Sequence, residues 1–414
     1  MKVLQHLAGS AVCAVLIAAC SGPQAAGPAK TPFEQALADR DGGRLPEAEA
    51  KLEALADGGD ERARVEWIET LLLRGKHAQA VERLKPMFEA HREDPRWILL
   101  LARAHDGAGN ADEAIALYGR LLQHNPSDGP IALRLADLMV SRGDVVGACT
   151  VAEAALQREP DNVALLVTFS RALLGRGRLP QALAQAQRAT TLAPSDPQAW
   201  FQLAQVQMMA GDLDKARDSL ELSVKFDAQF GDALRDLGIV LLELGDTKKA
   251  VQVLRHASQV APDSGVVWTA LGIARHRDKD LVGAIAALET ALRLQPQAVQ
   301  AYVSLAEVSL DNGQPRRAQT EARKGRDRLG SQATADVRAR VEGLLLRAVV
   351  VANLADALCR NRKDADAVQS EITKELKDDG LERLGPEAAK VGADATAQIR
   401  AAQARCATPE TKTP

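Results

Sequence analysis

The histidines and cysteines are the residues of this chain best suited to catalysis or metal binding, and their spacing decides whether they could act together. The seven histidines are His6, His77, His91, His105, His124, His256 and His276. No two of them are four positions apart, and the chain has neither a Cys-x-x-Cys pair nor a His-Glu-x-x-His motif. These spacings matter because they bring two metal ligands to one face of a helix or turn. We therefore expect no metal site and no cofactor.

Two short motifs are similar to ion-binding loops, and both are better explained as turns. Gly175-Arg176-Gly177 follows an expected helix instead of a strand, and Pro180 stands where a phosphate loop needs its third glycine. Asp278-Lys279-Asp280 lacks the glycine and the distal glutamate of a calcium loop. The chain also has no Gly-x-Ser-x-Gly nucleophile motif. We therefore expect a protein that is not an enzyme.

Cys20 is the cysteine with the clearest chemical context. Lys2 opens the chain, and an apolar run of 13 residues covers positions 7–19. That run is too short to cross a bilayer core of about 30 Å, so it indicates an export signal over residues 1–19. The ending Ile17-Ala18-Ala19-Cys20 resembles the lipobox of bacterial lipoproteins. The resemblance implies cleavage before Cys20 and lipidation of its thiol and amine, with palmitate as the acyl group. An ordinary secretory signal is the alternative.

The residues after Cys20 indicate where the protein would be held. Residues 20–31 contain mostly Gly, Pro and Ala, which predicts a flexible tether. Several acyl chains together make a firm membrane anchor. Ser21 follows the cysteine, and a residue other than Asp there usually accompanies outer-membrane sorting in Gram-negative lipoproteins. We expect an outer-membrane lipoprotein of the bacterial envelope facing the periplasm, with the inner membrane and the cell surface as alternatives.

The other cysteines have separate expectations. Cys13 lies in the expected signal, and Cys149 lies at a place that other repeats fill with apolar residues, which predicts a small buried side chain. Cys359 and Cys406 remain, and an exported protein can form disulfides. The two either pair or stay free. A bridge would close a loop of about 48 residues and add roughly 4 kcal/mol in the chain-entropy model.

Glycine recurs with a period of 34 residues through most of the chain. Only 30 of the 414 residues are glycine, so a long series in one register is not chance. A turn between two antiparallel helices needs a residue that accepts a left-handed backbone, and glycine does so without a Cβ clash. The series is Gly75, Gly109, Gly143, Gly177, Gly211, Gly245 and Gly313, with Lys279 in the missing place and Gly43 in an earlier unit offset by two.

Alanine and proline follow the same period. A small residue is needed where two helices approach closely, because a larger side chain would overpack. Proline ends a helix that it cannot continue. The alanines are Ala48, Ala80, Ala114, Ala148, Ala182, Ala216, Ala250, Ala284 and Ala318, and the prolines are Pro126, Pro160, Pro194, Pro262 and Pro296.

These columns resemble the tetratricopeptide repeat family. One repeat reads Trp200, Leu203, Ala204, Gly211 and Ala216, which follows the family pattern of a large residue, Leu, a small residue, Gly and Ala. The resemblance implies an all-α fold, a right-handed α-solenoid of about nine helix-turn-helix repeats over residues 32–330. A helix pair cannot bury its apolar stripe alone, so stacked pairs share one core.

The period stops after Gly330. Val341, Leu345 and Val349 belong to a long helical pattern over residues 333–359, and Ile372 and Leu376 mark a second helix that ends at Gly380. An alanine-rich helix is expected over residues 386–406, and residues 407–414 are expected to be disordered. The open end of a solenoid exposes its core. Residues 331–406 are therefore expected to cap the array, with a partner-docking module as the alternative.

The first helix of each repeat is expected to line a concave surface. Helical periodicity places the second, fifth, ninth and twelfth residues of each repeat on that surface. Phe201 and Met208 would form an apolar floor suited to a peptide or helix, unless they pack against the neighbouring repeat. The Lys and Asn of the carboxylate clamp found in some tetratricopeptide domains are absent here. The candidate groove consists of Arg171, Gln198, Phe201, Gln205, Met208 and Arg235, and Asp232 and Glu307 hold equivalent places.

The overall charge favours protein partners. The formal net charge is −3, without a long run of one sign, which argues against nucleic acid as a partner. The layout is similar to that of lipid-anchored tetratricopeptide proteins that assist assembly of pilus secretins and polysaccharide export machines. The resemblance implies a scaffold for protein or peptide partners at the envelope. A periplasmic chaperone for exported polypeptides, or an accessory subunit of an envelope enzyme, is the alternative.

Overall fold

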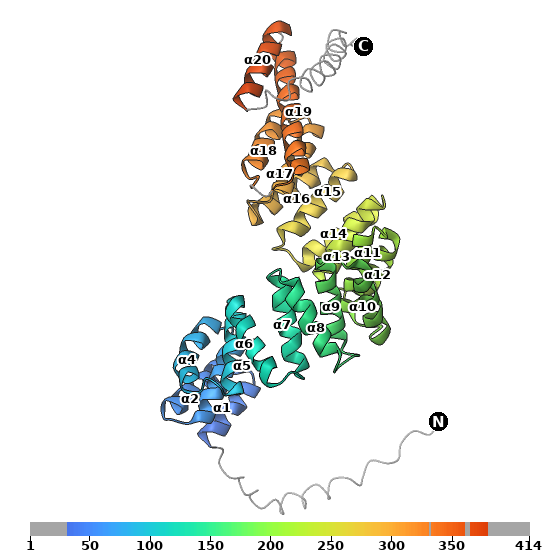
Figure 1. The fold of residues 1–414 in the computed structure, drawn as a ribbon. Coiled ribbons are helices and arrows are strands. Elements are labelled where there is room, and N and C mark those ends of the chain that lie inside the picture. Colours follow the sequence, from blue (N-terminus) through green and yellow to red (C-terminus); the bar gives the residue numbers. More distant parts are fainter. Residues whose placement is uncertain (1–30, 331–332, 361–364, 380–414) are drawn as a thin grey trace, which may run out of the picture. The chain divides into compact units, whose positions relative to one another are not determined.

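The computed structural model describes residues 31–330, 333–360 and 365–379 (Figure 1). All twenty secondary-structure elements in these ranges are α-helices, and none is a strand. The prediction of an all-α solenoid is confirmed. Among the described helices, none is both long enough and apolar enough to span a bilayer.

The chain divides into two compact units, Met1–Glu159 and Pro160–Pro414. The 34-residue period gives no sign of this boundary, because Pro160 falls in step with the other prolines. The helices of unit 1 are α1 (Pro32–Asp41), α2 (Leu45–Asp57), α3 (Glu61–Leu73), α4 (His77–Ala90), α5 (Pro95–Gly107), α6 (Ala111–His124), α7 (Gly129–Ser141) and α8 (Val145–Leu156).

Unit 2 contains five further pairs and two additional helices. The pairs are α9 (Val163–Gly175) with α10 (Leu179–Leu192), α11 (Pro197–Ala210) with α12 (Leu213–Phe226), α13 (Gly231–Glu243) with α14 (Thr247–Val260), α15 (Gly265–Arg277) with α16 (Leu281–Leu294), and α17 (Val299–Asp311) with α18 (Pro315–Asp327). The additional helices are α19 (Ala335–Arg360) and α20 (Ala365–Asp378).

Within each unit, consecutive helices pack against each other, and first helices also contact the first helix of a neighbouring pair. Such first-helix contacts join α1 to α3 and α3 to α5 in unit 1. In unit 2 they join α9 to α11, and then α13, α15, α17 and α19 in sequence. Because each pair contacts only its neighbours, each unit is a short stack whose core continues from pair to pair.

The turn within each helix pair has the left-handed backbone that the glycine series predicts. Gly75 has φ 69° and Gly245 has φ 85°, and the other glycines of the series also have positive φ. Lys279 adopts φ 68° and is the one residue other than glycine with positive φ in the described ranges. The turn geometry therefore holds even where the glycine is missing, which explains Asp278-Lys279-Asp280 as a turn.

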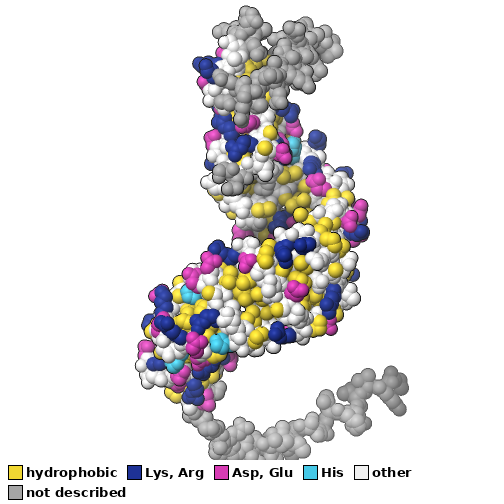
Figure 2. All heavy atoms as spheres, viewed as in Figure 1, with side chains coloured by type: hydrophobic (Ala, Val, Ile, Leu, Met, Phe, Trp, Pro, Cys, Tyr) yellow, Lys and Arg dark blue, Asp and Glu magenta, His cyan; other side chains and the backbone are white. Residues whose placement is uncertain are grey.

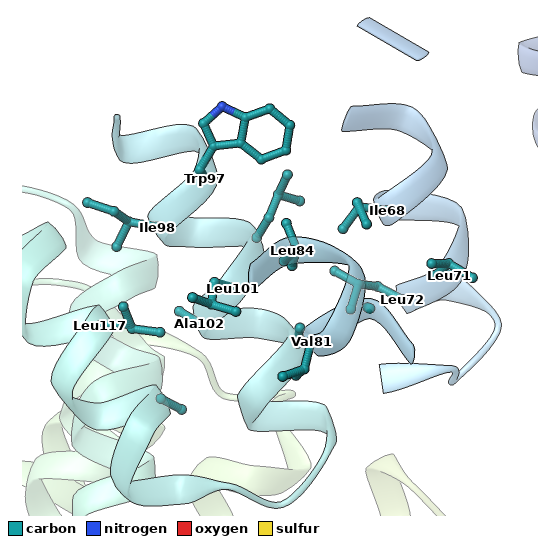
Figure 3. Packing of buried hydrophobic residues seen from close by; sticks show 14 of the residues in the cluster. Ile68, Leu71, Leu72, Val81, Leu84, Trp97, Ile98, Leu101, Ala102 and Leu117 are labelled. Carbon is teal, nitrogen blue, oxygen red and sulfur yellow. The ribbon is translucent and has the colours of Figure 1, made fainter. Parts of the chain in front are cut away.

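The alanine series lies where the helices meet. All nine alanines, from Ala48 to Ala318, are 0% exposed. Their neighbours are mostly Leu, Ile and Val, as in the unit 1 core formed by Ile68, Leu84 and Leu101 (Figure 3). Cys149 is buried and free, as predicted for a small apolar residue.

Helices α19 and α20 cover the end of the ninth pair. Val341, Leu345 and Val349 of α19 are fully buried and join Ile372 of α20 in one cluster with side chains of α17 and α18. Arg316 of α18 extends this contact with ion pairs to carboxylates on both helices. The helices therefore act as the expected cap.

Several predictions fall outside the described residues. They are the signal over residues 1–19, lipidation of Cys20, most of the tether, the helix over residues 386–406 and the tail over 407–414. A Cys359–Cys406 disulfide also involves side chains outside the described part. These remain predictions.

Candidate partner-binding groove

A cavity of unit 2 lies on its first-helix side and has a volume of about 730 Å³. Side chains from α13, α15, α17 and α19 line it, so four successive first helices contribute. We call it the groove cavity. Its lining consists of Ile239, Leu242, Glu243, Val266, Thr269, Ala270, Ile273, His276, Arg277, Gln295, Ala298, Val299, Gln300, Ser304, Glu307 and Arg340.

The floor of the groove cavity is apolar. Ile239 and Ile273 occupy the ninth place of successive repeats and are half-buried. Val266, at the second place, is 47% exposed and adds apolar surface to this floor. Apolar side chains that remain in contact with water in a hollow favour burial by another apolar group.

Two ion pairs flank this floor. On the α13–α15 side, Arg277 lies 3.5 Å from the carboxylate of Glu243 and donates a hydrogen bond of 2.9 Å to the Leu242 carbonyl oxygen. On the α17–α19 side, Arg340 donates to Glu307 at 2.9 Å. Both pairs are partly exposed, so they contribute little to stability. They give the cavity a polar rim of both signs.

His276 closes one end of the groove cavity. Its Nε2 lies 2.7 Å from Oδ2 of Asp311, and its side chain is 20% exposed. The contact links α15 to α17. It holds the imidazole against the lining, where a bound side chain would meet it.

Most of the groove residues that the sequence predicts lie outside the groove cavity, and a binding role for them stays a prediction. Of the residues that the sequence singled out, only Glu307 lines the groove cavity. The ring of Phe201 lies 4.8 Å from the ring of Phe230, which begins the next pair, at 58° between the planes. Met208 is half-buried against the same core cluster. Phe201 therefore packs on the neighbouring repeat, the alternative left open by the sequence.

The polar members of the predicted groove make local contacts. Arg171 and Gln198 are exposed. Arg235 pairs with Asp232 at 2.6 Å and with Asp236 at 2.9 Å. Burial raises the pKa of Asp236, against the opposing effect of Arg235 and of a hydrogen bond from Gln205. These contacts hold α11 and α13 together and leave little of Arg235 available to a ligand.

The residues missed by the sequence analysis obey the rule it used. Val266, Thr269, Ile273 and His276 hold the second, fifth, ninth and twelfth places of one repeat. The periodicity therefore points to the same face of the first helix in this repeat as in the repeats that the sequence singled out. The signal that marks this repeat is its apolar second and ninth residues, Val266 and Ile273.

The first-helix side of unit 1 has a different lining. Arg103 pairs with Glu69 at 2.6 Å, and Arg134 donates from Nη2 to Oδ1 of Asp106 at 2.6 Å. The hydroxyl of Tyr118 donates to Asp106 at 3.5 Å. Charged and histidine side chains crowd the part of unit 1 that carries α1 to α6 on the face shown in Figure 2. The charged side chains named here on the first-helix side of unit 1 are therefore paired with each other.

Tyr118 is the most strongly perturbed titratable group near these pairs. Its side chain is 3% exposed. Burial, followed by the negative charge of Asp106, raises the pKa of Tyr118 to about 12. The phenol therefore stays protonated and can continue to donate to Asp106.

Possible metal ligands occur throughout the described part of the chain. No group of three or more His, Cys, Asp or Glu side chains is placed to hold a metal ion in those ranges. The groove cavity offers apolar contacts and a paired rim, which suit binding.

Comparison with known families agrees with this architecture. A family described as the Cilia and flagella-associated protein 70 C-terminal domain matches residues 34–284, more than half of the chain, and a tetratricopeptide repeat family matches residues 269–322. The chain belongs to the tetratricopeptide repeat family. Tetratricopeptide repeat proteins bind protein or peptide partners and are generally not catalysts, so this fold is a protein-interaction scaffold.

Individual relatives match only parts of the tetratricopeptide array. Cellulose synthase operon protein C of Pseudomonas fluorescens is 29% identical over 29% of this chain and 9% of that protein. The tetratricopeptide repeat and J domain-containing co-chaperone DNJ1 of Fusarium oxysporum is 32% identical over 28% of this chain and 24% of that protein. The chain therefore spans less than a quarter of the curated relatives' length.

A solved structure supports the fold over a longer stretch. The crystal structure of the APC/C hetero-tetramer Cut9-Hcn1 matches with a TM-score of 0.52 and 18% identity, covering 73% of this chain and 59% of that one. At this identity the likeness concerns the tetratricopeptide fold alone.

Proposed function

We propose that this protein is a non-catalytic scaffold whose groove cavity receives an apolar segment of a partner protein. The observation that carries the proposal is the hollow itself: four first helices surround about 730 Å³ with a partly exposed apolar floor and a paired polar rim. An amphipathic helix would bury its apolar face on Ile239, Val266 and Ile273 and leave its polar edges beside the rim. Helix recognition of this kind needs no carboxylate clamp.

We further propose that the scaffold works at the bacterial envelope, held by lipid on Cys20. Three features support this: the lipobox-like ending at Cys20, the tether after it, and similarity to cellulose synthase operon protein C. A machine that assembles or exports polysaccharide is therefore the favoured context, and a pilus or secretion machine is the next. Similarity to a co-chaperone favours a periplasmic chaperone-like binder as the second candidate.

The groove can be tested by photo-crosslinking. A photoreactive amino acid replaces Ile273 in unit 2 or, as the matched control, Arg103 at the same ninth place in unit 1. We expect a discrete crosslinked partner from position 273 and none from position 103. Ile273→Ala should weaken capture of that partner by roughly 2 kcal/mol, because the side chain sits at the centre of the floor. Equal crosslinking from both positions would contradict the proposal.

The same crosslinking experiment distinguishes a scaffold from a chaperone-like binder, and a labelling control tests the lipid anchor. A single crosslinked band indicates a defined partner, and a smear of many clients favours the chaperone-like binder. Labelled palmitate should enter the wild-type protein and not Cys20→Ala. Equal labelling of both proteins would contradict the proposed lipid anchor at Cys20 and would not affect the groove proposal.

A further inference from the structure

A second cavity lies in unit 1 and shares no residue with the Arg103–Glu69 and Arg134–Asp106 ion pairs. Its volume is about 520 Å³, within the range of small-ligand pockets. Side chains from α2, α3, α4 and α5 form it, together with His91 just after α4. We call it the tryptophan cavity. Its lining consists of Ala56, Asp57, Glu61, Arg64, Trp67, Glu82, Arg83, Pro86, Met87, Ala90, His91 and Trp97.

The two tryptophans of this cavity have unsatisfied indole groups. Trp67 and Trp97 are 2% and 1% exposed, and the Nε1 of each is buried without a hydrogen-bond partner among the described residues. In Figure 3 the indole nitrogen of Trp97 lies on the ring edge that points away from Val81 and Leu101. A buried donor without an acceptor costs roughly 1–3 kcal/mol. Two such donors, on two residues that line one cavity, point to a missing acceptor.

The other two tryptophans show how the fold normally satisfies an indole. Trp200 donates to the carbonyl oxygen of Pro194, and Trp268 donates to that of Pro262, both at 2.8 Å. Each stands at the fourth place of its repeat, six residues after the proline. Trp67 and Trp97 stand at the seventh and third places, so this acceptor is not offered to them. The unpaired donors are therefore specific to the tryptophan cavity.

Arg64 adds a cation to these donors. It is half-buried, and its Nε donates to the Ala56 carbonyl oxygen at 3.2 Å. It has no ion pair within the described part of the chain, which leaves its terminal nitrogens for another acceptor. The guanidinium of Arg83 lies 5.2 Å from the centre of the Trp67 ring and is paired with Glu53 at 3.5 Å, so Arg64 is the cation of the lining without an ion pair in the described ranges.

The carboxylates of the lining are mostly engaged elsewhere. Glu82 accepts from Lys85 at 2.6 Å, and Glu61 lies 3.9 Å from Arg96. Asp57 is exposed and has no ion-pair partner among the described residues. The lining thus offers two indole N–H donors, the Arg64 guanidinium and the His91 imidazole, and Asp57 is its carboxylate without an ion pair among the described residues.

We propose that the tryptophan cavity binds the carboxylate of a small apolar acid. The oxygens would accept from Arg64 and from the indole N–H groups, while Met87, Pro86 and the tryptophan rings enclose the apolar body. Both indole nitrogens are closed to water, so a ligand has to displace a lining side chain. Met87 and Arg83 are long, unbranched and not fully buried, and can move.

The test uses the tryptophans as reporters in the full chain. Trp200→Phe with Trp268→Phe leaves Trp67 and Trp97 as the only tryptophans, because the sequence has four. Circular dichroism checks that this variant stays helical. We expect 4-phenylbutyrate to change its fluorescence in a saturable manner, whereas 4-phenylbutyramide has no such effect. No saturable change up to millimolar acid, or an equal response to acid and amide, would overturn the proposal.

Three single substitutions decide whether the named residues act as described. Arg64→Gln should weaken binding about tenfold or more, because a charge-assisted hydrogen bond is lost. Arg62→Gln, on the same helix but outside the lining, should leave binding unchanged. Asp57→Asn should tighten binding roughly twofold to fivefold by removing a repelling charge. Equal effects of Arg64→Gln and Arg62→Gln would overturn the assignment.

A free acid and the end of a peptide present the same carboxylate, and a further pair of probes separates them. A tripeptide ending in Phe is compared with its C-terminal amide. Binding of 4-phenylbutyrate but not of the tripeptide assigns a free acid, and tighter binding of the tripeptide assigns a peptide end. Because none of these residues lies in unit 2, failure here leaves the groove proposal untouched.

Discussion

The first-helix sides of the two units are built from the same repeat and differ in what fills them. In unit 1, Arg103 and Arg134 cross from helix to helix to pair with carboxylates of neighbouring repeats. In unit 2, Ile239 and Ile273 stand at the place of Arg103 and leave a hollow of about 730 Å³. At two ninth places of unit 1, Glu69 and Arg103 are charged and form an ion pair, whereas these two ninth places of unit 2 carry isoleucines that leave apolar surface in a cavity. The residues that every repeat shares therefore specify the fold. The residues at a few positions on the first helix specify which surface the fold presents.

The largest predicted effect tests whether the two scaffolds are equivalent. Ala114→Leu in unit 1 and Ala250→Leu in unit 2 should each lower the free energy of unfolding by about 3 kcal/mol, because both alanines are 0% exposed between helices. The matched exposed substitutions, Ala54→Leu and Ala210→Leu, should change it by less than about 0.5 kcal/mol. Urea denaturation measures all four. A tolerated leucine at one buried alanine would break the equivalence.

A smaller effect should appear in unit 1 alone, at alkaline pH. The folded pKa of Tyr118 is about 12, above the unfolded value near 10. The folded state holds the proton more tightly, so this stability is complete below about pH 10 and is lost as pH rises toward 12. The loss should be roughly 2 kcal/mol. Hydrogen exchange of α5 and α6, followed against pH, measures it.

Two phenylalanine variants provide the control for the alkaline effect. Tyr118→Phe should abolish this part of the pH dependence. Tyr302→Phe, which changes the chain's only other tyrosine and lies in unit 2, should leave it in place. If both variants keep the same alkaline loss, the buried phenol of unit 1 is not its source.

The smallest predicted effect concerns the turn of unit 2 that lacks glycine. Lys279 holds φ 68°, a left-handed conformation that costs a residue with a Cβ roughly 1–2 kcal/mol. Lys279→Gly should therefore raise the free energy of unfolding by about 1 kcal/mol, and Gly245→Lys at the equivalent turn should lower it by about the same amount. Thermal and urea unfolding measure both. A destabilising Lys279→Gly would show that the lysine side chain itself holds the turn.

The scaffold was predictable from the sequence because its requirements are local. A left-handed turn selects glycine and a close helix contact selects alanine. The positions of Gly211 and Ala216 in their repeat therefore mark the turn and the helix contact in the other repeats as well. The two C-terminal helices were predictable for a similar reason, since the apolar series through Val341 and Ile372 marks one face of each.

The groove was harder to predict because it depends on how successive pairs are spaced. Phe201 and Ile273 look alike in the sequence, each an apolar residue on the first-helix face. Phe201 meets Phe230 of the next pair, whereas Ile273 faces a cavity. The boundary after Glu159 and the indoles of Trp67 and Trp97 also depend on packing between repeats. No single repeat contains that information.

Four successive first helices form the walls of the groove cavity. The width of its opening therefore depends on how the helix pairs are stacked, that is, on the angle between one helix pair and the next. A force along the stack of helix pairs, or a small change in the angle between two distant pairs, would change the width of the cavity. It would therefore change how well a bound segment fits. The affinity of the cavity for a bound segment would then depend on mechanical tension as well as on the shape of that segment.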